Sequence, residues 1–214
     1  MLKTYVEKLL TLEPQDLEII AFLHEPRAGL LSADQRHSLW LQAQACGKHE
    51  AENLRKQVGD CSIEQIVQLC GGRIHEIEEI PDPRYALFAY YEKPNDITVN
   101  IANALRSVQL IKEYRLEPLL DNVCIRDLLL SHELYHLLVS RKKDSFVQQR
   151  HVRLLGLGHW ALKGKLECLE EIAAMAFSSE LLHLSCSPYV YHVIMLYACH
   201  PEQAEKMMAD YAIL

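Results

Sequence analysis

The sequence predicts an α+β fold that is mostly helical, with a small antiparallel sheet in the middle of the chain. Three observations favour this class. Helical patterns fill most of residues 3–58, apolar and polar residues alternate as in strands between residues 73 and 101, and helical patterns resume at residue 102. A run of strands between two runs of helices is typical of α+β proteins.

The N-terminal part is predicted to contain three helices. The first restarts at Pro14, because proline is favoured at the first helical position. The second and third each begin with a capping box of the form Ser-x-x-Gln, and glycines after the third supply its C-cap. The predicted helices cover residues 3–23, 33–58 and 62–70, and the capping boxes are Ser32 to Gln35 and Ser62 to Gln65.

The middle of the chain is predicted to form strands. Residues 73–78 alternate apolar and polar side chains, the period of a half-buried strand. Residues 86–91 and 97–101 are rich in aromatic and β-branched side chains, which strands favour. Residues 94–96, Pro-Asn-Asp, have the composition of a turn, so these two segments are predicted to form a hairpin.

The rest of the chain is predicted to be helical. We expect residues 1–60 to form a helical extension and residues 61–214 to form the main domain. Trp40 and Leu41 in the extension are expected to bury against that domain, with a partner-binding face as the alternative. The predicted C-terminal helices cover residues 102–115, 121–139, 146–156, 163–184 and 189–212.

Composition and charge narrow the class of protein. A net charge of −7 over 214 residues argues against a nucleic-acid-binding surface. Seven cysteines, without a Cys-x-x-Cys pair, indicate reduced thiols rather than a disulfide framework or a zinc ribbon. The N-terminus becomes charged too early for a signal peptide, and no apolar run approaches the ~20 residues that cross a bilayer. We therefore expect a cytoplasmic protein without a membrane partner.

The most informative stretch is the HExxH motif from His132 to His136, in an apolar segment without a helix breaker. On a helix the two histidines point within about 40° of each other, so both imidazoles can reach one metal ion. Glu133 lies about 100° round from His132, where its carboxylate can take a proton from water. A catalytic zinc site needs three protein ligands. The motif therefore predicts Zn²⁺ as cofactor, His132 and His136 as ligands and Glu133 as the catalytic base.

The third ligand is expected among the acidic residues of the segment 167–177. Spacing alone leaves Glu170 and Glu171 as alternatives, whereas Glu167 best suits a solvated face. In either case the small side chains of Ala173 and Ala174 would let this helix approach the HExxH helix closely.

The sequence resembles the ImmA/IrrE-type metallopeptidases over roughly residues 62–185. The resemblance rests on the order of a sheet, HELYH, and then a helix with the pattern Glu-x-x-Ala-x-x-Phe-Ser-x-x-Leu-Leu. It implies a zincin-like fold of the gluzincin type, a zinc-dependent peptidase, and a third zinc ligand at Glu171. The residues in register with this pattern are Ala174, Phe177, Ser178, Leu181 and Leu182.

The resemblance also implies a partner. Members of the family commonly cleave a helix-turn-helix repressor, and many are encoded on mobile elements, so a DNA-binding protein is the implied substrate. Residues 1–60 lie outside the matched region and are our candidate for docking it. Met175 departs from the family, which usually has Asn or Asp there, and would remove a hydrogen bond close to the metal ligands.

Two rival functions fit the same residues. One is a zinc-binding regulatory module that has lost catalysis, which Met175 and the N-terminal extension favour. The other is a zinc hydrolase acting on a non-peptide bond. A fourth ligand or a proton donor could also come from the C-terminal histidines, although surface or structural roles are more common for such residues. These are His151, His159, His183, His192 and His200.

Overall fold

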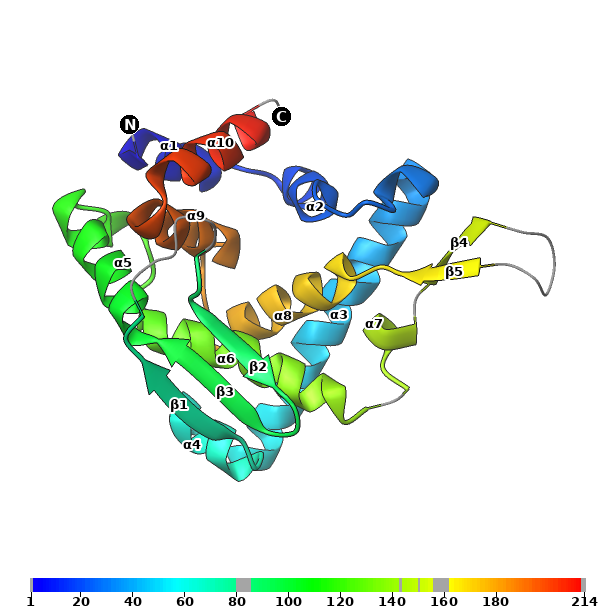
Figure 1. Ribbon diagram of the computed structural model, residues 1–214, viewed down its shortest axis with the longest axis horizontal. Coiled ribbons are helices and arrows are strands. Elements are labelled where there is room, and N and C mark those ends of the chain that lie inside the picture. The colour runs from blue at the N-terminus through cyan, green and yellow to red at the C-terminus, as the bar shows by residue number, and fades with distance from the viewer. Residues whose placement is uncertain (1, 80–85, 143, 150, 156–161, 213–214) are drawn as a thin grey trace.

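The computed structural model describes residues 2–79, 86–142, 144–149, 151–155 and 162–212. This part of the chain is mostly helical with a small sheet, which confirms the α+β class (Figure 1). Among the described residues, none of the helices combines the length and the apolar character that a membrane crossing requires. The N-terminal helices are α1 (Leu2–Leu9), α2 (Pro14–Phe22), α3 (Ala33–Val58) and α4 (Ile63–Leu69), with a 3₁₀ turn at Ala28–Leu30.

Both predicted capping boxes are present. The Ser32 hydroxyl accepts the backbone N–H of Gln35 at 3.2 Å, and the Gln35 side chain accepts the N–H of Ser32 at 2.8 Å. Ser62 and Gln65 repeat this arrangement at the start of α4. The predicted restart at Pro14 is confirmed, since α1 ends at Leu9, Glu13 has an extended backbone and α2 begins at Pro14.

The sheet contains β1 (Arg73–Ile77), β2 (Ala89–Glu92) and β3 (Asp96–Asn100) in the order β1-β3-β2. The predicted hairpin is confirmed, since β2 and β3 pair antiparallel. The prediction of a wholly antiparallel sheet is wrong, because β3 lies between the other two strands and pairs parallel with β1. The chain therefore crosses over after β1 instead of turning back on it, which leaves β2 at an edge of the sheet.

The C-terminal half departs further from the helical prediction. The helix predicted over residues 146–156 ends at residue 149. Strands β4 (His151–Leu155) and β5 (Leu162–Lys165) pair antiparallel and extend away from the helices in Figure 1. The helix predicted over residues 189–212 is interrupted at Pro201, which begins a new helix. The elements are α5 (Ile101–Glu113), a 3₁₀ turn (Glu117–Leu119), α6 (Ile125–Ser140), α7 (Phe146–Gln149), β4 (His151–Leu155), β5 (Leu162–Lys165), α8 (Cys168–Leu181), α9 (Pro188–Cys199) and α10 (Pro201–Ala212).

Helix α3 and helix α8 lie in close contact, and α6 packs between α8 and the sheet. A side chain at Gly47 of α3 would collide with the backbone oxygen of Ala173, so this glycine permits the approach. The backbone of α8 at Ala173 thus lies against α3. That Ala173 and Ala174 let α8 approach the HExxH helix closely stays a prediction. Trp40 is buried, as predicted, but Leu41 is about half exposed. The division of the chain into a helical extension (residues 1–60) and a main domain (residues 61–214) stays a prediction.

Candidate metal centre

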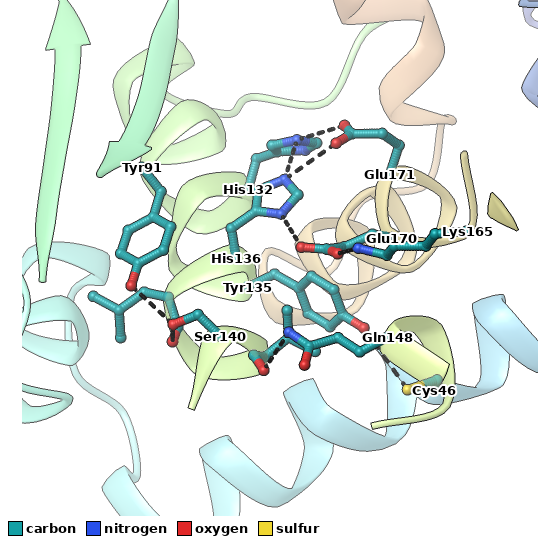
Figure 2. Close-up of polar contacts among 12 residues, drawn as sticks. Cys46, Tyr91, His132, Tyr135, His136, Ser140, Gln148, Lys165, Glu170 and Glu171 are labelled. Carbon is teal, nitrogen blue, oxygen red and sulfur yellow. Dashed lines mark hydrogen bonds and ion pairs between the residues drawn. The ribbon is translucent and has the colours of Figure 1, made fainter. Parts of the chain in front are cut away.

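Helix α6 carries the HExxH motif across the middle of the molecule. Tyr135 is fully buried and its ring lies 5.4 Å from that of Phe177, so this residue of the motif belongs to the core, as expected. The adjacent part of the helix surface presents His132 and His136, whose Nε2 atoms lie 3.2 Å apart (Figure 2). The helical spacing thus aims both imidazoles at one point.

Glu171 of α8 approaches both histidines with its carboxylate. Its Oε2 lies 3.2 Å from Nε2 of His132, and its Oε1 lies 3.5 Å from Nε2 of His136 (Figure 2). Donor atoms of these three residues all lie within 4.8 Å of one another. Ligands about 2.0–2.2 Å from a tetrahedral ion lie about 3.3–3.6 Å from each other, so the three residues fit zinc.

Glu171 and His132 shift each other's pKa values. Desolvation works against ionisation of Glu171, but the hydrogen bond from His132 and the positive potential of both imidazoles outweigh it and lower the pKa of Glu171 to about 2. For His132, desolvation lowers the pKa, but the hydrogen bond with Glu171 and the negative charges of Glu133 and Glu171 together raise it. A carboxylate that stays ionised beside two imidazoles is a suitable donor set for a divalent cation.

Glu170, the alternative third ligand, makes a different contact. Its Oε1 lies 3.0 Å from Nδ1 of His136, on the far side of the imidazole from Nε2. Its other oxygen accepts a hydrogen bond of 2.7 Å from Lys165 Nζ, at the end of β5. The two neighbouring glutamates therefore occupy different positions. Glu171 lies beside the Nε2 atoms of both histidines, whereas Glu170 contacts Nδ1 of His136.

Glu133, the predicted base, is 8% exposed and lies beside this centre. Burial raises the pKa of its carboxyl group, while His132 and His136 oppose the rise. The backbone N–H of Tyr91 in β2 donates to the carboxylate. A buried carboxylate with a raised pKa is suited to proton transfer near neutral pH.

The centre opens into a pocket of about 870 Å³. The pocket is bounded by β2, α6, α8, α9 and α10, and much of its wall is apolar. Met175, which departs from the pattern that the sequence resembles, places a thioether in this wall. Apolar residues that line the pocket include Phe88, Leu128, Leu129, Met195, Leu196 and Met207.

One C-terminal histidine also lines the pocket. His192 of α9 is largely buried, and burial followed by the nearby charge of His132 lowers its pKa. His183 and His200 do not line the pocket, the side chain of His151 is not described, and His159 lies outside the described residues. Sequence reasoning gave no ground for choosing His192, and it missed Lys165 and Tyr91, because their positions depend on tertiary structure.

Comparisons with family models, with characterised proteins and with solved structures find no match to this chain. The resemblance to the ImmA/IrrE-type metallopeptidases, and the zinc ligands it implies, therefore stay predictions.

Proposed function

We propose that this chain is a cytoplasmic zinc-dependent metallopeptidase that cleaves a specific protein partner. The observation that carries the proposal is the triangle of donor atoms from His132, His136 and Glu171, with the buried carboxylate of Glu133 beside it. Three protein ligands, an open side and an adjacent base are the composition of a hydrolytic zinc site.

His132, His136 and Glu171 would hold the ion. Zinc in such a site supplies a Lewis acid that polarises a carbonyl and lowers the pKa of water. Glu133 takes a proton from the attacking water and passes it to the leaving amine. The backbone N–H of Tyr91 favours the ionised form of the Glu133 carboxylate, as its effect on the pKa shows.

The surroundings of the site favour a peptide substrate. Strand β2 is at an edge of the sheet, and its residues Ala89, Tyr90 and Tyr91 line the pocket. An edge strand offers main-chain groups that an extended peptide can pair with. The apolar wall of the pocket suits an uncharged side chain of that peptide. These features support hydrolysis of a peptide bond over hydrolysis of a small polar ester.

The partner is proposed to be a protein, and a helix-turn-helix repressor is the first candidate. This follows from the family resemblance and from the net charge of −7, which disfavours direct binding to DNA. A protease restricted to one partner should digest casein poorly. Robust casein digestion, or tight sequence-specific DNA binding by the chain alone, would count against this part of the proposal.

The deciding experiment compares the wild-type protein with Glu133→Gln. Both are loaded with zinc and incubated with a cell lysate that contains candidate repressors, and new cleavage products are identified by mass spectrometry. We expect zinc-dependent products with the wild type, none with the variant, and equal zinc content in both. Undiminished cleavage by Glu133→Gln would remove this mechanism.

Met175 favours the rival function, a zinc-binding module without catalysis. A thioether in the pocket wall cannot replace the hydrogen bond of an Asn or Asp side chain. In the same experiment this rival predicts full zinc content and no cleavage products from either protein.

A further inference from the structure

The strongest unassigned arrangement is a chain of three side chains behind the centre. Lys165 Nζ lies 2.7 Å from one oxygen of Glu170, and the other oxygen lies 3.0 Å from Nδ1 of His136 (Figure 2). Glu170 and His136 are 18% and 15% exposed, so water competes weakly for these bonds. The three residues come from β5, α8 and α6.

The two ring nitrogens of His136 thus meet different partners. Glu170 is paired with the ammonium group of Lys165, and a carboxylate in such an ion pair can only accept hydrogen bonds. The Nδ1 atom of His136 must therefore carry the hydrogen. In a neutral imidazole this leaves the lone pair on Nε2, the atom that lies 3.2 Å from Nε2 of His132.

We propose that Glu170, held by Lys165, is a positioning residue that aims Nε2 of His136 at the metal ion. The inference rests on the proposed metal site. Carboxylates that accept from the outer nitrogen of a ligating histidine fix its ring and raise its basicity, and losing one weakens metal binding about 10–100-fold.

Lys165 has two effects in this arrangement. Its ammonium group compensates the charge of Glu170, which lies next in sequence to the acidic Glu171. It also restricts rotation of the Glu170 side chain, because one oxygen is bound to Lys165 while the other is bound to His136. Lys165 is the last residue of β5, so the base of the β4–β5 hairpin contributes directly to the orientation of a metal ligand.

The test measures metal affinity without any substrate. Zinc dissociation constants are obtained by competition with a chromophoric chelator, and Co²⁺ absorption spectra report the coordination geometry. We expect Glu170→Ala to bind zinc about 10–100-fold more weakly and to change the Co²⁺ spectrum. Glu170→Gln, which keeps an acceptor but loses the charge, should lie between Glu170→Ala and wild type.

Two further variants test the lysine. Lys165→Met should weaken zinc binding in the same direction by a smaller factor, and Lys165→Arg should stay close to wild type. Glu167→Gln is the matched control, because it removes one carboxylate from the same end of α8 at an exposed position. Circular dichroism checks folding, and if Glu170→Ala does not fold, the Lys165 variants decide.

The proposal is overturned if Glu170→Ala and Lys165→Met both bind zinc within twofold of wild type, or if Glu167→Gln loses as much affinity as they do. It also falls if the wild-type protein binds no zinc. If the variants rank in zinc affinity as expected but the wild-type protein cleaves nothing, the peptidase function is contradicted and the positioning role of Glu170 stays supported.

Discussion

The carboxylate of Glu25 accepts a hydrogen bond of 3.0 Å from the backbone nitrogen of Glu167, although the two residues are 142 positions apart in sequence. The same oxygen accepts from the nitrogen of Cys168 at 3.3 Å. The first N–H groups of a helix have no partner within it, so Glu25 caps α8 from the N-terminal segment. The capped turn leads directly into Glu170 and Glu171.

Replacing Glu25 should therefore destabilise the protein. Glu25 is 7% exposed and its loss leaves two partly buried N–H donors unpaired, so we expect Glu25→Ala to lower the free energy of unfolding by about 1–3 kcal/mol. Urea denaturation measures the change. Glu52→Ala, at an exposed position on α3, is the control and should stay within about 0.5 kcal/mol of wild type. Equal effects of the two substitutions would contradict the capping role.

Gly47 should tolerate no larger side chain. A Cβ atom there would overlap the Ala173 carbonyl oxygen and lie 3.0 Å from the Phe177 nitrogen. We expect Gly47→Ala to destabilise the protein by about 1–3 kcal/mol, although alanine favours a helix by about 1 kcal/mol. Gly29→Ala is the control, because nothing lies within 4 Å of its added methyl group. Thermal unfolding of the two variants should differ clearly, and similar melting temperatures would contradict this account.

The two neighbouring glutamates should differ in their effect on metal content. Glu171→Ala removes a donor oxygen, so zinc content after dialysis should fall well below the about one equivalent expected for wild type. Glu170→Ala keeps the three donors and should reach full content when zinc is in excess. Atomic absorption measures both. If Glu171→Ala keeps its full zinc content and Glu170→Ala loses zinc, then Glu170 and not Glu171 is the third ligand.

Asp121 should make stability depend on pH in acid. Desolvation opposes its ionisation, but hydrogen bonds from Cys186 and Ser185 outweigh it and lower the pKa from 3.8 to about 2. A lowered folded-state pKa gives stability that is present above about pH 4 and is lost as pH falls towards 2. Solvent screening limits the effect to about 1–2 kcal/mol.

Asp121→Asn isolates this contribution. Urea unfolding of the metal-free proteins at pH 6 and pH 2.5 should show a stability difference between wild type and variant that shrinks in acid. A difference that stays the same at both pH values would assign the effect to packing instead of charge.

Local signals in the sequence predicted the parts of the fold that local interactions determine. The Ser-x-x-Gln capping boxes and the turn at residues 94–96 each involve residues within a few positions of one another, and both are present. The HExxH histidines likewise need only one turn of helix to converge. Contacts of this range are visible in a sequence because they recur at fixed spacing.

Pairings between distant segments were not predictable in the same way. Nothing local shows that β3 inserts between β1 and β2, or that residues 151–155 pair with residues 162–165. Lys165 was assigned to a helix, so its contact with Glu170 had no basis in the sequence. The choice between Glu170 and Glu171 also depends on how α8 packs against α6, which spacing within one helix cannot determine.

His192 should stabilise negative charge that develops on the substrate beside the metal centre. It lines the pocket from α9, near His132 and Glu171, and its lowered pKa keeps it neutral at pH 7. A neutral imidazole can donate a hydrogen bond to the oxygen that becomes negative when water attacks a carbonyl. Removing one such donor lowers kcat by a factor of about 10²–10³.

His192→Ala should therefore lower kcat for cleavage of the protein partner by about 10²-fold, with KM and zinc content nearly unchanged. His192→Gln keeps a donor and should recover part of the loss. Loss of zinc from His192→Ala would make this residue a metal ligand, and full activity would leave it only a packing role.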